Sequence, residues 1–171
     1  MRVERTFAFV DLCGFTAFTE TKGDDEASAV LARFRAEVRA SASDFGVRVA
    51  KWLGDGAMFV GVDGRQLVGA VLELERRLEE SGLPLPIRVG LATGAVIVFE
   101  GDDYIGGPVN LAARLCDVAL PHETLCTVAV AAFVPDWAEA VPAGERVIAG
   151  LASPVPVIRL AATAAFADLD P

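Results

Sequence analysis

A hairpin pattern that lies between two helical patterns restricts the folds open to this chain more than any other feature. Two apolar runs suited to strands, Val47 to Leu53 and Ala57 to Val62, meet at the turn Gly54-Asp55-Gly56. Apolar residues recur at helical spacing over residues 24–46 before the hairpin and over residues 67–78 after it. The sequence therefore predicts a helix, a two-stranded hairpin and a second helix, in that order.

Strand patterns flank this group on both sides. Phe7-Ala8-Phe9-Val10 runs into Asp11 before the first helix, and Ile87 to Phe99 follows the second. The resulting order of strand, helix, strand, strand, helix, strand is the split β-α-β arrangement of ferredoxin-like folds. We therefore predict the α+β class, with a ferredoxin-like βαββαβ core. In such a sheet the first strand lies beside the third, so Asp11 and Asp55 are expected to be neighbours.

The C-terminal part predicts an additional helix and further strands. Pro108 suits the first turn of a helix over about 109–119, because its missing N–H does no harm there. The expected strands are short and lie near Leu125 to Val128, Arg146 to Ile148 and Val155 to Leu160. We expect one domain over residues 1–171, with its core at about 6–160 and a loose tail over 161–171.

Charge, hydropathy and composition exclude several classes of function. The net charge of −9 argues against a nucleic-acid binder, which needs a basic face. The three cysteines are odd in number and widely spaced, so they suggest neither a disulfide framework nor a zinc site. We find no apolar run of the roughly 20 residues that a membrane span needs and no signal-peptide layout, so we expect a soluble, cytosolic protein. The only histidine, His122, is interpreted as a loop residue, which argues against histidine-based acid–base chemistry.

Asp11 and Asp55 are the first candidate site residues. Two carboxylates brought together at strand ends repel each other, and their ionised forms become favourable when a divalent cation lies between them. The alternative is that both are turn formers, Asp55 above all, because Asp beside Gly is common in hairpins.

Asn110 and Arg114 are the second candidate pair. They are four residues apart and would share one face of the predicted helix. Arg114 lies within about two turns of the helix N-terminus, where the helix dipole disfavours a cation unless an anion is bound nearby. The alternative is a solvated pair beside a structural Gly-Pro turn.

Lys51 and Asp103 complete the candidates. Only two of the 15 basic residues are lysine, and strand alternation places Lys51 on the same side as Val49. It could extend its ammonium into water from an edge strand, or donate to a ring nitrogen in a pocket. Asp103 is by default an acid of a hairpin loop.

Three motifs together give a specific resemblance. They are F-V-D-L-C-G-F-T at 9–16, K-W-L-G-D-G at 51–56 and D-Y-I-G-G-P-V-N-L-A-A-R at 103–114. In order and spacing the sequence resembles the catalytic domain of class III adenylate and guanylate cyclases from about Thr6 to Leu160.

The resemblance implies a reaction at two divalent metal ions, Mg²⁺ or Mn²⁺. Asp11 and Asp55 match the family's metal-binding aspartates, and the Leu12 carbonyl matches an extra metal ligand. Asn110 matches the residue that orients the ribose, and Arg114 matches the residue that stabilises the transition state. The implied activity converts ATP to 3′,5′-cyclic AMP and pyrophosphate by attack of the ribose 3′-OH on the α-phosphate.

Substrate choice and assembly also follow from the resemblance. Lys51 and Asp103 match the residues that read adenine, which implies ATP rather than GTP. In the family the metal aspartates come from one subunit and the other residues from its partner, so the resemblance implies a head-to-tail homodimer with composite sites. A regulatory domain outside this chain would be compatible with this arrangement.

One departure concerns the triphosphate. Family members often place a Lys or Arg near the last hairpin to bind the β- and γ-phosphates, but residues 147–151 offer neither. Arg146 is the candidate substitute.

Four alternatives remain open at this point. The chain could be a catalytically silent cyclase-like module that dimerises or binds nucleotide, although none of the six side chains is lost. A guanylate cyclase would be expected to carry Glu at the position of Lys51. A plain ferredoxin-like interaction domain would leave the motif spacing as coincidence, and a diguanylate cyclase relative would need a G-G-D-E-F-type turn, which the chain lacks.

Overall fold

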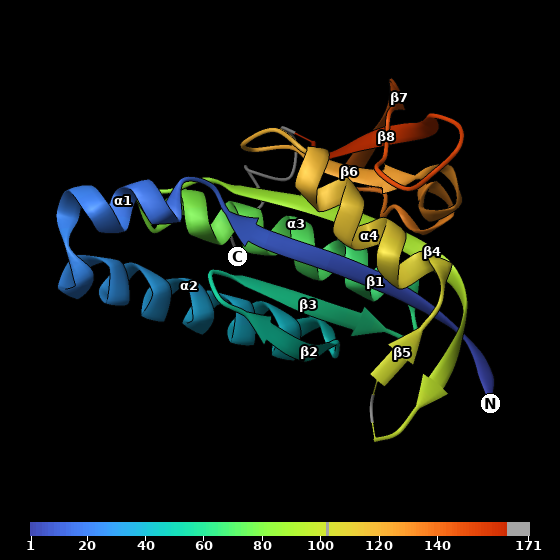
Figure 1. Cartoon of the computed structure of the whole chain (residues 1–171), viewed down its shortest axis with the longest axis horizontal. Helices are drawn as coiled ribbons and strands as arrows, with labels where there is room; N and C mark the ends of the chain where they lie inside the picture. Colours follow the sequence, from blue (N-terminus) through green and yellow to red (C-terminus); the bar gives the residue numbers. More distant parts are fainter. Residues whose placement is uncertain (102, 164–171) are drawn as a thin grey trace.

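A single eight-stranded sheet organises the fold (Figure 1). The computed structural model describes residues 1–101 and 103–163. The strands are β1 (Arg2–Leu12), β2 (Arg48–Leu53), β3 (Gly56–Gly61), β4 (Ile87–Phe99), β5 (Asp103–Ile105), β6 (Thr124–Thr127), β7 (Ala138–Arg146) and β8 (Val155–Ala162). Their order is β2-β3-β1-β4-β6-β8-β7, with β5 paired to β4. Paired strands are antiparallel except β4 and β6, which are parallel.

Helices cover both faces of this sheet. They are α1 (Phe15–Lys22), α2 (Asp24–Phe45), α3 (Gly64–Glu80), α4 (Gly107–Val118) and the short 3₁₀ helix η1 (Val128–Phe133). Figure 1 shows α4 in front of the sheet, whereas α3 lies behind β1. The alternation along β1 explains the two layers, because Ala8 and Val10 pack into the core with α2 and α3 while Phe7 packs into a second core with α4.

Glycine at position 90 allows α4 to lie directly on β4. A Cβ at Gly90 would come within 2.2 Å of the Cys116 backbone nitrogen and 2.3 Å of the Ala112 carbonyl oxygen. A side chain at position 90 would therefore force the backbone of α4 away from the sheet. Because α4 carries Asn110 and Arg114, this contact positions both candidate residues.

Helix boundaries follow local sequence. The Asp63 side chain caps α3 by accepting a hydrogen bond of 2.8 Å from the Arg65 backbone N–H. Gly46 ends α2 in the left-handed conformation, with φ of 65°. Pro108 lies in the first turn of α4, as expected from its position in the sequence.

The predicted α+β class is confirmed, two local expectations differ from the structure, and one helix was missed. No strand begins at Arg146: β7 covers Ala138–Arg146, a largely exposed strand with a register shift after Pro142 that removes any regular apolar alternation. Residues 161 and 162, expected to belong to the tail, are part of β8, and residues 164–171 lie outside the described part of the chain. Helix α1 was not predicted, since none of its residues is buried. None of the described helices is long and apolar enough to cross a membrane.

Candidate active site

The carboxylates of Asp11 and Asp55 come together at one end of β1 and β3. Asp11 pairs with Gly56 across the antiparallel ladder, and the Leu12 backbone N–H donates to the Asp55 carbonyl oxygen at 3.1 Å. Burial raises the pKa of the Asp11 carboxyl; a hydrogen bond from Arg88 lowers it, and the charge of Asp55 raises it again. The strand order thus makes neighbours of two acids that are far apart in the sequence.

Space beside these carboxylates depends on glycine. A Cβ at Gly56 would lie 2.7 Å from the Val10 carbonyl oxygen and 3.3 Å from Asp11 Oδ1. Glycine therefore keeps the volume next to the Asp11 carboxylate free. Two carboxylates with a strand-end carbonyl at Leu12 are hard oxygen donors, the donor set that Mg²⁺ and Mn²⁺ favour.

Arg88, the second residue of β4, is part of this site and was not predicted from the sequence. Its Nη2 and Nε donate to Asp11 Oδ2 at 2.9 and 3.2 Å, and its Nη1 donates to the Asp117 carbonyl oxygen at 2.8 Å. The signal lies in the strand register, which places Arg88 directly opposite Asp11. A cation at Asp11 would have to share this carboxylate with Arg88 or displace it.

Lys51 of β2 and Asp103 of β5 form an ion pair. Lys51 Nζ lies 2.5 Å from Asp103 Oδ1, and the two side chains are 49% and 51% exposed. The structure thus brings together two candidate residues from segments that are distant in sequence. Their charges are accessible from solvent, so a ligand could reach both of them.

The expected orientation of Lys51 is wrong. The register of β2 against β3 shifts between Val49 and Lys51, so strict alternation does not hold there. Val49 and Trp52 both pack against the core under α2, and Arg35 stacks over the Trp52 ring at 4.9 Å. The bulge therefore separates the Lys51 side chain from Val49 and leaves its ammonium free to meet Asp103.

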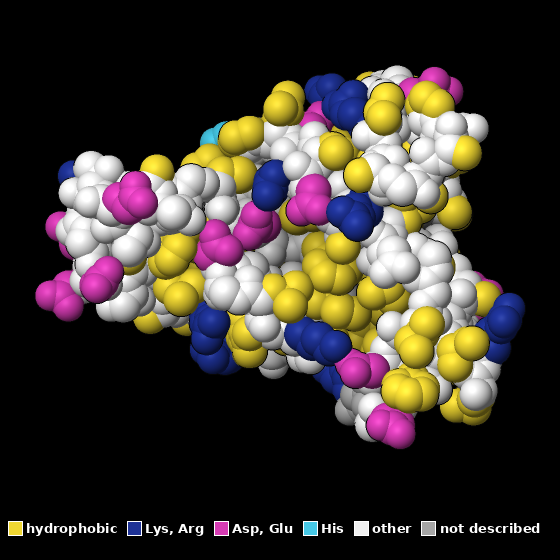
Figure 2. All heavy atoms as spheres, viewed as in Figure 1, with side chains coloured by type: hydrophobic (Ala, Val, Ile, Leu, Met, Phe, Trp, Pro, Cys, Tyr) yellow, Lys and Arg dark blue, Asp and Glu magenta, His cyan; other side chains and the backbone are white. Residues whose placement is uncertain are grey.

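Asn110 and Arg114 line one cavity of about 800 Å³. The cavity lies between α4, the middle of β4 and the loop over residues 148–151. The sheet face that carries α4 is apolar near its centre, and charged side chains of both signs border it (Figure 2). Because Asp117 also lines the cavity and accepts from Arg88, α4 connects this cavity to the carboxylates.

Arg146 lies apart from this cavity. Its Nη2 is 3.1 Å from Glu123 Oε1, and its Nη1 donates to the Ala143 carbonyl oxygen at 3.1 Å. The Glu123 side chain is only 8% exposed, so Arg146 compensates a buried charge. The contacts of Arg146 are structural, and the cavity lining does not include it.

Comparison with known proteins adds independent information. No family model matches the chain. A protein of Mycobacterium bovis described as uncharacterized is 35% identical over 152 residues, which are 89% of this chain and 40% of that protein. A pH-sensitive adenylate cyclase of Mycobacterium tuberculosis is 31% identical over 160 residues, 91% of this chain and 40% of that enzyme. The chain therefore spans about 40% of the length of these relatives.

Solved structures establish the fold. The adenylyl cyclase CyaB from P. aeruginosa matches with a TM-score of 0.79 at 24% identity, covering 95% of this chain and 96% of that chain. The guanylate cyclase domain of RhGC from Catenaria anguillulae, in complex with GTP, matches with a TM-score of 0.83 at 19% identity, covering 95% and 98%. The fold is thus the one shared by adenylyl and guanylyl cyclase catalytic domains.

The predicted resemblance to the catalytic domains of class III adenylate and guanylate cyclases is confirmed. Both substrate types occur among the matching folds, so the fold alone does not select one of them. Relatives named adenylate cyclase, including one of Streptomyces coelicolor at 33% identity over 132 residues, support the adenylate type.

Proposed function

We propose that this chain is an adenylate cyclase catalytic domain, which converts ATP to 3′,5′-cyclic AMP and pyrophosphate. The observation that carries the proposal is the pair of Lys51 and Asp103, a hydrogen-bond donor beside an acceptor. Adenine offers an acceptor at N1 and a donor at N6, so Lys51 would donate to N1 and Asp103 would accept from the N6 amine. Guanine presents the reverse pattern and would leave both groups without partners.

ATP would have to separate Lys51 from Asp103 in order to bind between them. Both side chains are about half exposed, and an ion pair of this kind contributes only about 0–1 kcal/mol to stability. Opening the pair therefore costs little. Because Lys51 Nζ and Asp103 Oδ1 are 2.5 Å apart, both groups could contact the same edge of one base.

Asp11, Asp55 and the Leu12 carbonyl would hold two divalent metal ions, Mg²⁺ or Mn²⁺. When bound, the metals activate the ribose 3′-OH and screen the charge of the triphosphate. The chain contributes the carboxylates, the free volume beside Gly56 and the competing guanidinium of Arg88. Arg88 would keep Asp11 in place before the metal binds.

Arg114 and Asn110 would act on the reacting groups from α4. Negative charge grows on the phosphate oxygens during the attack, and a fixed guanidinium stabilises that charge more in the transition state than in the ground state. Asn110, one helical turn away, would hold the ribose in an attacking geometry. Both line the same cavity, so they can contact one bound ligand.

We propose that complete sites form between two copies of the chain, arranged head to tail. Support comes from the family resemblance and from the chain itself, which carries both sets of residues: Asp11 on β1 and Asp55 in the turn before β3, and the pair of Lys51 and Asp103 between β2 and β5. Each copy would contribute Asp11 and Asp55 to one site and Lys51, Asp103, Asn110 and Arg114 to the other. A monomer would then be inactive. Arg146 would serve the triphosphate only by leaving Glu123, so we do not assign it a phosphate-binding role.

The base-reading role is tested by exchanging one lysine at a time. We expect Lys51→Glu to lower kcat/KM for ATP roughly 10–100-fold and to lower the ATP/GTP ratio, because a charged hydrogen bond to the base is lost. Lys22→Glu is the matched control, since Lys22 is the only other lysine and lies in the last turn of α1. Steady-state rates with each nucleotide give the comparison.

Two results would count against the proposal. An unchanged ATP/GTP ratio in Lys51→Glu would refute the role of Lys51. Absence of cyclic nucleotide from the wild-type chain with either substrate would favour the silent cyclase-like module instead.

A further inference from the structure

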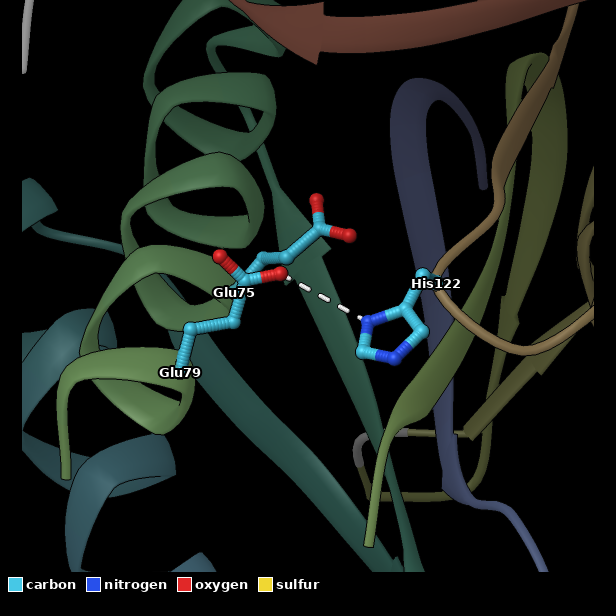
Figure 3. Close-up of side chains that lie close together, drawn as sticks. All are labelled: Glu75, Glu79 and His122. Atoms are coloured by element: carbon cyan, nitrogen blue, oxygen red, sulfur yellow. Dashed lines mark ion pairs between the residues drawn. The ribbon is translucent and has the colours of Figure 1, made fainter. Parts of the chain in front are cut away.

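A second group of potential metal ligands lies at the end of α3, away from the proposed nucleotide site. Glu75 and Glu79 are one turn apart on α3, and His122 lies in the loop between α4 and β6. One ligand atom from each residue lies within 4.8 Å of the other two. Figure 3 shows the imidazole facing the helix, with His122 Nδ1 3.5 Å from Glu79 Oε1.

Acids on α3 differ in how they are compensated. Glu73 accepts hydrogen bonds from Arg76 and Arg77, and Glu80 pairs with Arg76. Within the described residues, Glu75 makes no ion pair with a Lys or Arg, and Glu79 pairs only with His122. Among the described residues, the helix therefore carries two carboxylates without a Lys or Arg partner.

Glu75 is the more buried of these two carboxylates. It lines a cavity of about 320 Å³ whose other walls include Leu78, Leu85, Ile87 and His122. Burial, together with the charge of Glu79, raises the pKa of Glu75 to about 7. A cation in this cavity would offset both effects.

A buried hydroxyl beside Glu75 gives independent evidence. Thr124 is 1% exposed, and its Oγ1 makes no hydrogen bond of good geometry among the described residues. The hydroxyl lies near enough to Glu75 to lower the pKa of that carboxyl. A small movement of the Glu75 side chain would let Thr124 donate to it, and such outer hydrogen bonds orient metal-binding carboxylates.

The backbone holds His122 in place. His122 has a φ of 64°, the only positive φ of a non-glycine residue in the described ranges. Its N–H donates to the Ile87 carbonyl oxygen at 2.8 Å, and the next residue, Glu123, accepts from the Leu120 N–H at 2.9 Å. These hydrogen bonds direct the imidazole toward α3 and connect the cluster to the first residue of β4.

We propose that Glu75, Glu79 and His122 bind a divalent transition-metal ion of the zinc class. One imidazole nitrogen and two carboxylate oxygens form a donor set that zinc accepts, whereas Mg²⁺ and Ca²⁺ prefer oxygen alone. Ligand bonds of about 2.0–2.2 Å require the three ligand atoms to approach to about 3.3 Å of one another. The Glu79 and His122 side chains are each 60% exposed and can make that approach, with water as a fourth ligand.

The metal would connect α3 to the loop that precedes β6. Ile87 accepts the His122 N–H and directly precedes Arg88, the partner of Asp11, so the start of β4 connects the two sites. The inference does not depend on the proposed cyclase activity.

The single histidine of the chain allows a selective test. We would label the full chain with ¹⁵N-histidine, remove metals with a chelator and titrate Zn²⁺ while recording the ring nitrogens by NMR. We expect the His122 ring signals to shift as Zn²⁺ reaches equimolar amounts. A metal at Asp11 and Asp55 has no imidazole ligand, so the readout is specific to the new site.

Variants separate a three-residue site from weak binding by a lone histidine. We expect Glu75→Gln and Glu79→Gln to raise the Zn²⁺ concentration at the midpoint by at least about tenfold. Glu80→Gln is the matched control, because Glu80 lies on the same helix and pairs with Arg76 instead. Its midpoint should equal that of the wild type.

Two outcomes of the Zn²⁺ titration would overturn the site. One is the absence of a ring shift in the wild type at equimolar Zn²⁺; the other is an equal midpoint in all four proteins. Thermal unfolding gives a second measurement, in which Zn²⁺ should raise the Tm of the wild type but not that of His122→Asn. Asn tolerates the left-handed backbone at this position, so the variant removes the ligand while preserving the loop. An equal rise in Tm for both proteins would also contradict the proposal.

Discussion

At the scale of the residue, Arg88 changes how the carboxylate site is understood. Asp11 and Asp55 alone would form a repelling pair, but the Arg88 guanidinium already compensates Asp11 through two hydrogen bonds. Arg88 also anchors to the Asp117 carbonyl oxygen on α4. A divalent cation at Asp11 would therefore compete with the Arg88 guanidinium, which is held by hydrogen bonds to Asp11 and to the Asp117 carbonyl oxygen.

Arg88→Ala tests this competition. Without metal we expect the free energy of unfolding to fall by roughly 1–3 kcal/mol, because a partly buried carboxylate loses its partner. With Mn²⁺ the variant should recover more stability than the wild type gains, since the metal no longer displaces Arg88. Urea unfolding with chelator and with Mn²⁺ gives both values, and Arg65→Ala, at an exposed and distant ion pair, is the control. An equal gain from Mn²⁺ in variant and wild type would argue against competition.

At the scale of the element, the contact between β4 and α4 determines where Asn110 and Arg114 lie. Gly90→Ala should lower the free energy of unfolding by roughly 1–3 kcal/mol, because the new methyl group overlaps backbone atoms of Cys116 and Ala112. Gly107→Ala serves as the control, since a Cβ there would meet nothing within 4 Å. Chemical denaturation of both variants checks the difference, and equal stability would show that α4 does not depend on this close approach.

Helix α3 gives a pH dependence with a definite sign. The folded chain holds the pKa of Glu75 at about 7, above its ordinary value of 4.5, so between these values the folded state binds more protons than the unfolded state. Stability should therefore fall as pH rises from 4.5 to 7, by roughly 1–3 kcal/mol, and Glu75→Gln should remove this part of the slope. Urea unfolding across this range, with chelator present, measures it. A slope that is identical in variant and wild type would contradict the assignment.

The same elements show what could be predicted from the sequence. Asp11 and Asp55 were expected to be neighbours because the strand order alone requires it, and the register of β1 and β3 agrees. Lys51 was placed on the wrong side because a bulge in β2 leaves no mark in the apolar pattern. Arg88 was missed because its partner depends on the register between two strands that are distant in sequence.

Irregular segments were predicted less well for a physical reason. Strand β7 is exposed on most of its length and contains Pro142 at a shift in register, so neither burial nor alternation marks it. His122 was interpreted correctly as a loop residue, but its closeness to Glu75 and Glu79 depends on how the loop packs against α3. Tertiary contacts of this kind have no periodic signature.

At the scale of the whole molecule, the candidate residues lie in separate groups around one sheet. The candidate metal ligands are Asp11, near the end of β1, and Asp55, in the turn directly before β3, whereas Lys51 and Asp103 pair between β2 and β5. Asn110 and Arg114 form the third group; both lie on α4 and line the cavity of about 800 Å³. If two copies of the chain complete each site, as we propose, activity should depend on protein concentration.

Cyclic nucleotide formation tests most directly whether this chain is an adenylate cyclase with sites shared between two copies. The purified chain would be assayed with ATP and with GTP, in Mg²⁺ and in Mn²⁺, over a range of protein concentrations. We predict cyclic AMP from ATP, much less product from GTP, and a specific activity that rises as the chains associate. Formation of more cyclic GMP from GTP than cyclic AMP from ATP, or a specific activity that does not change between monomer and dimer, would contradict the account.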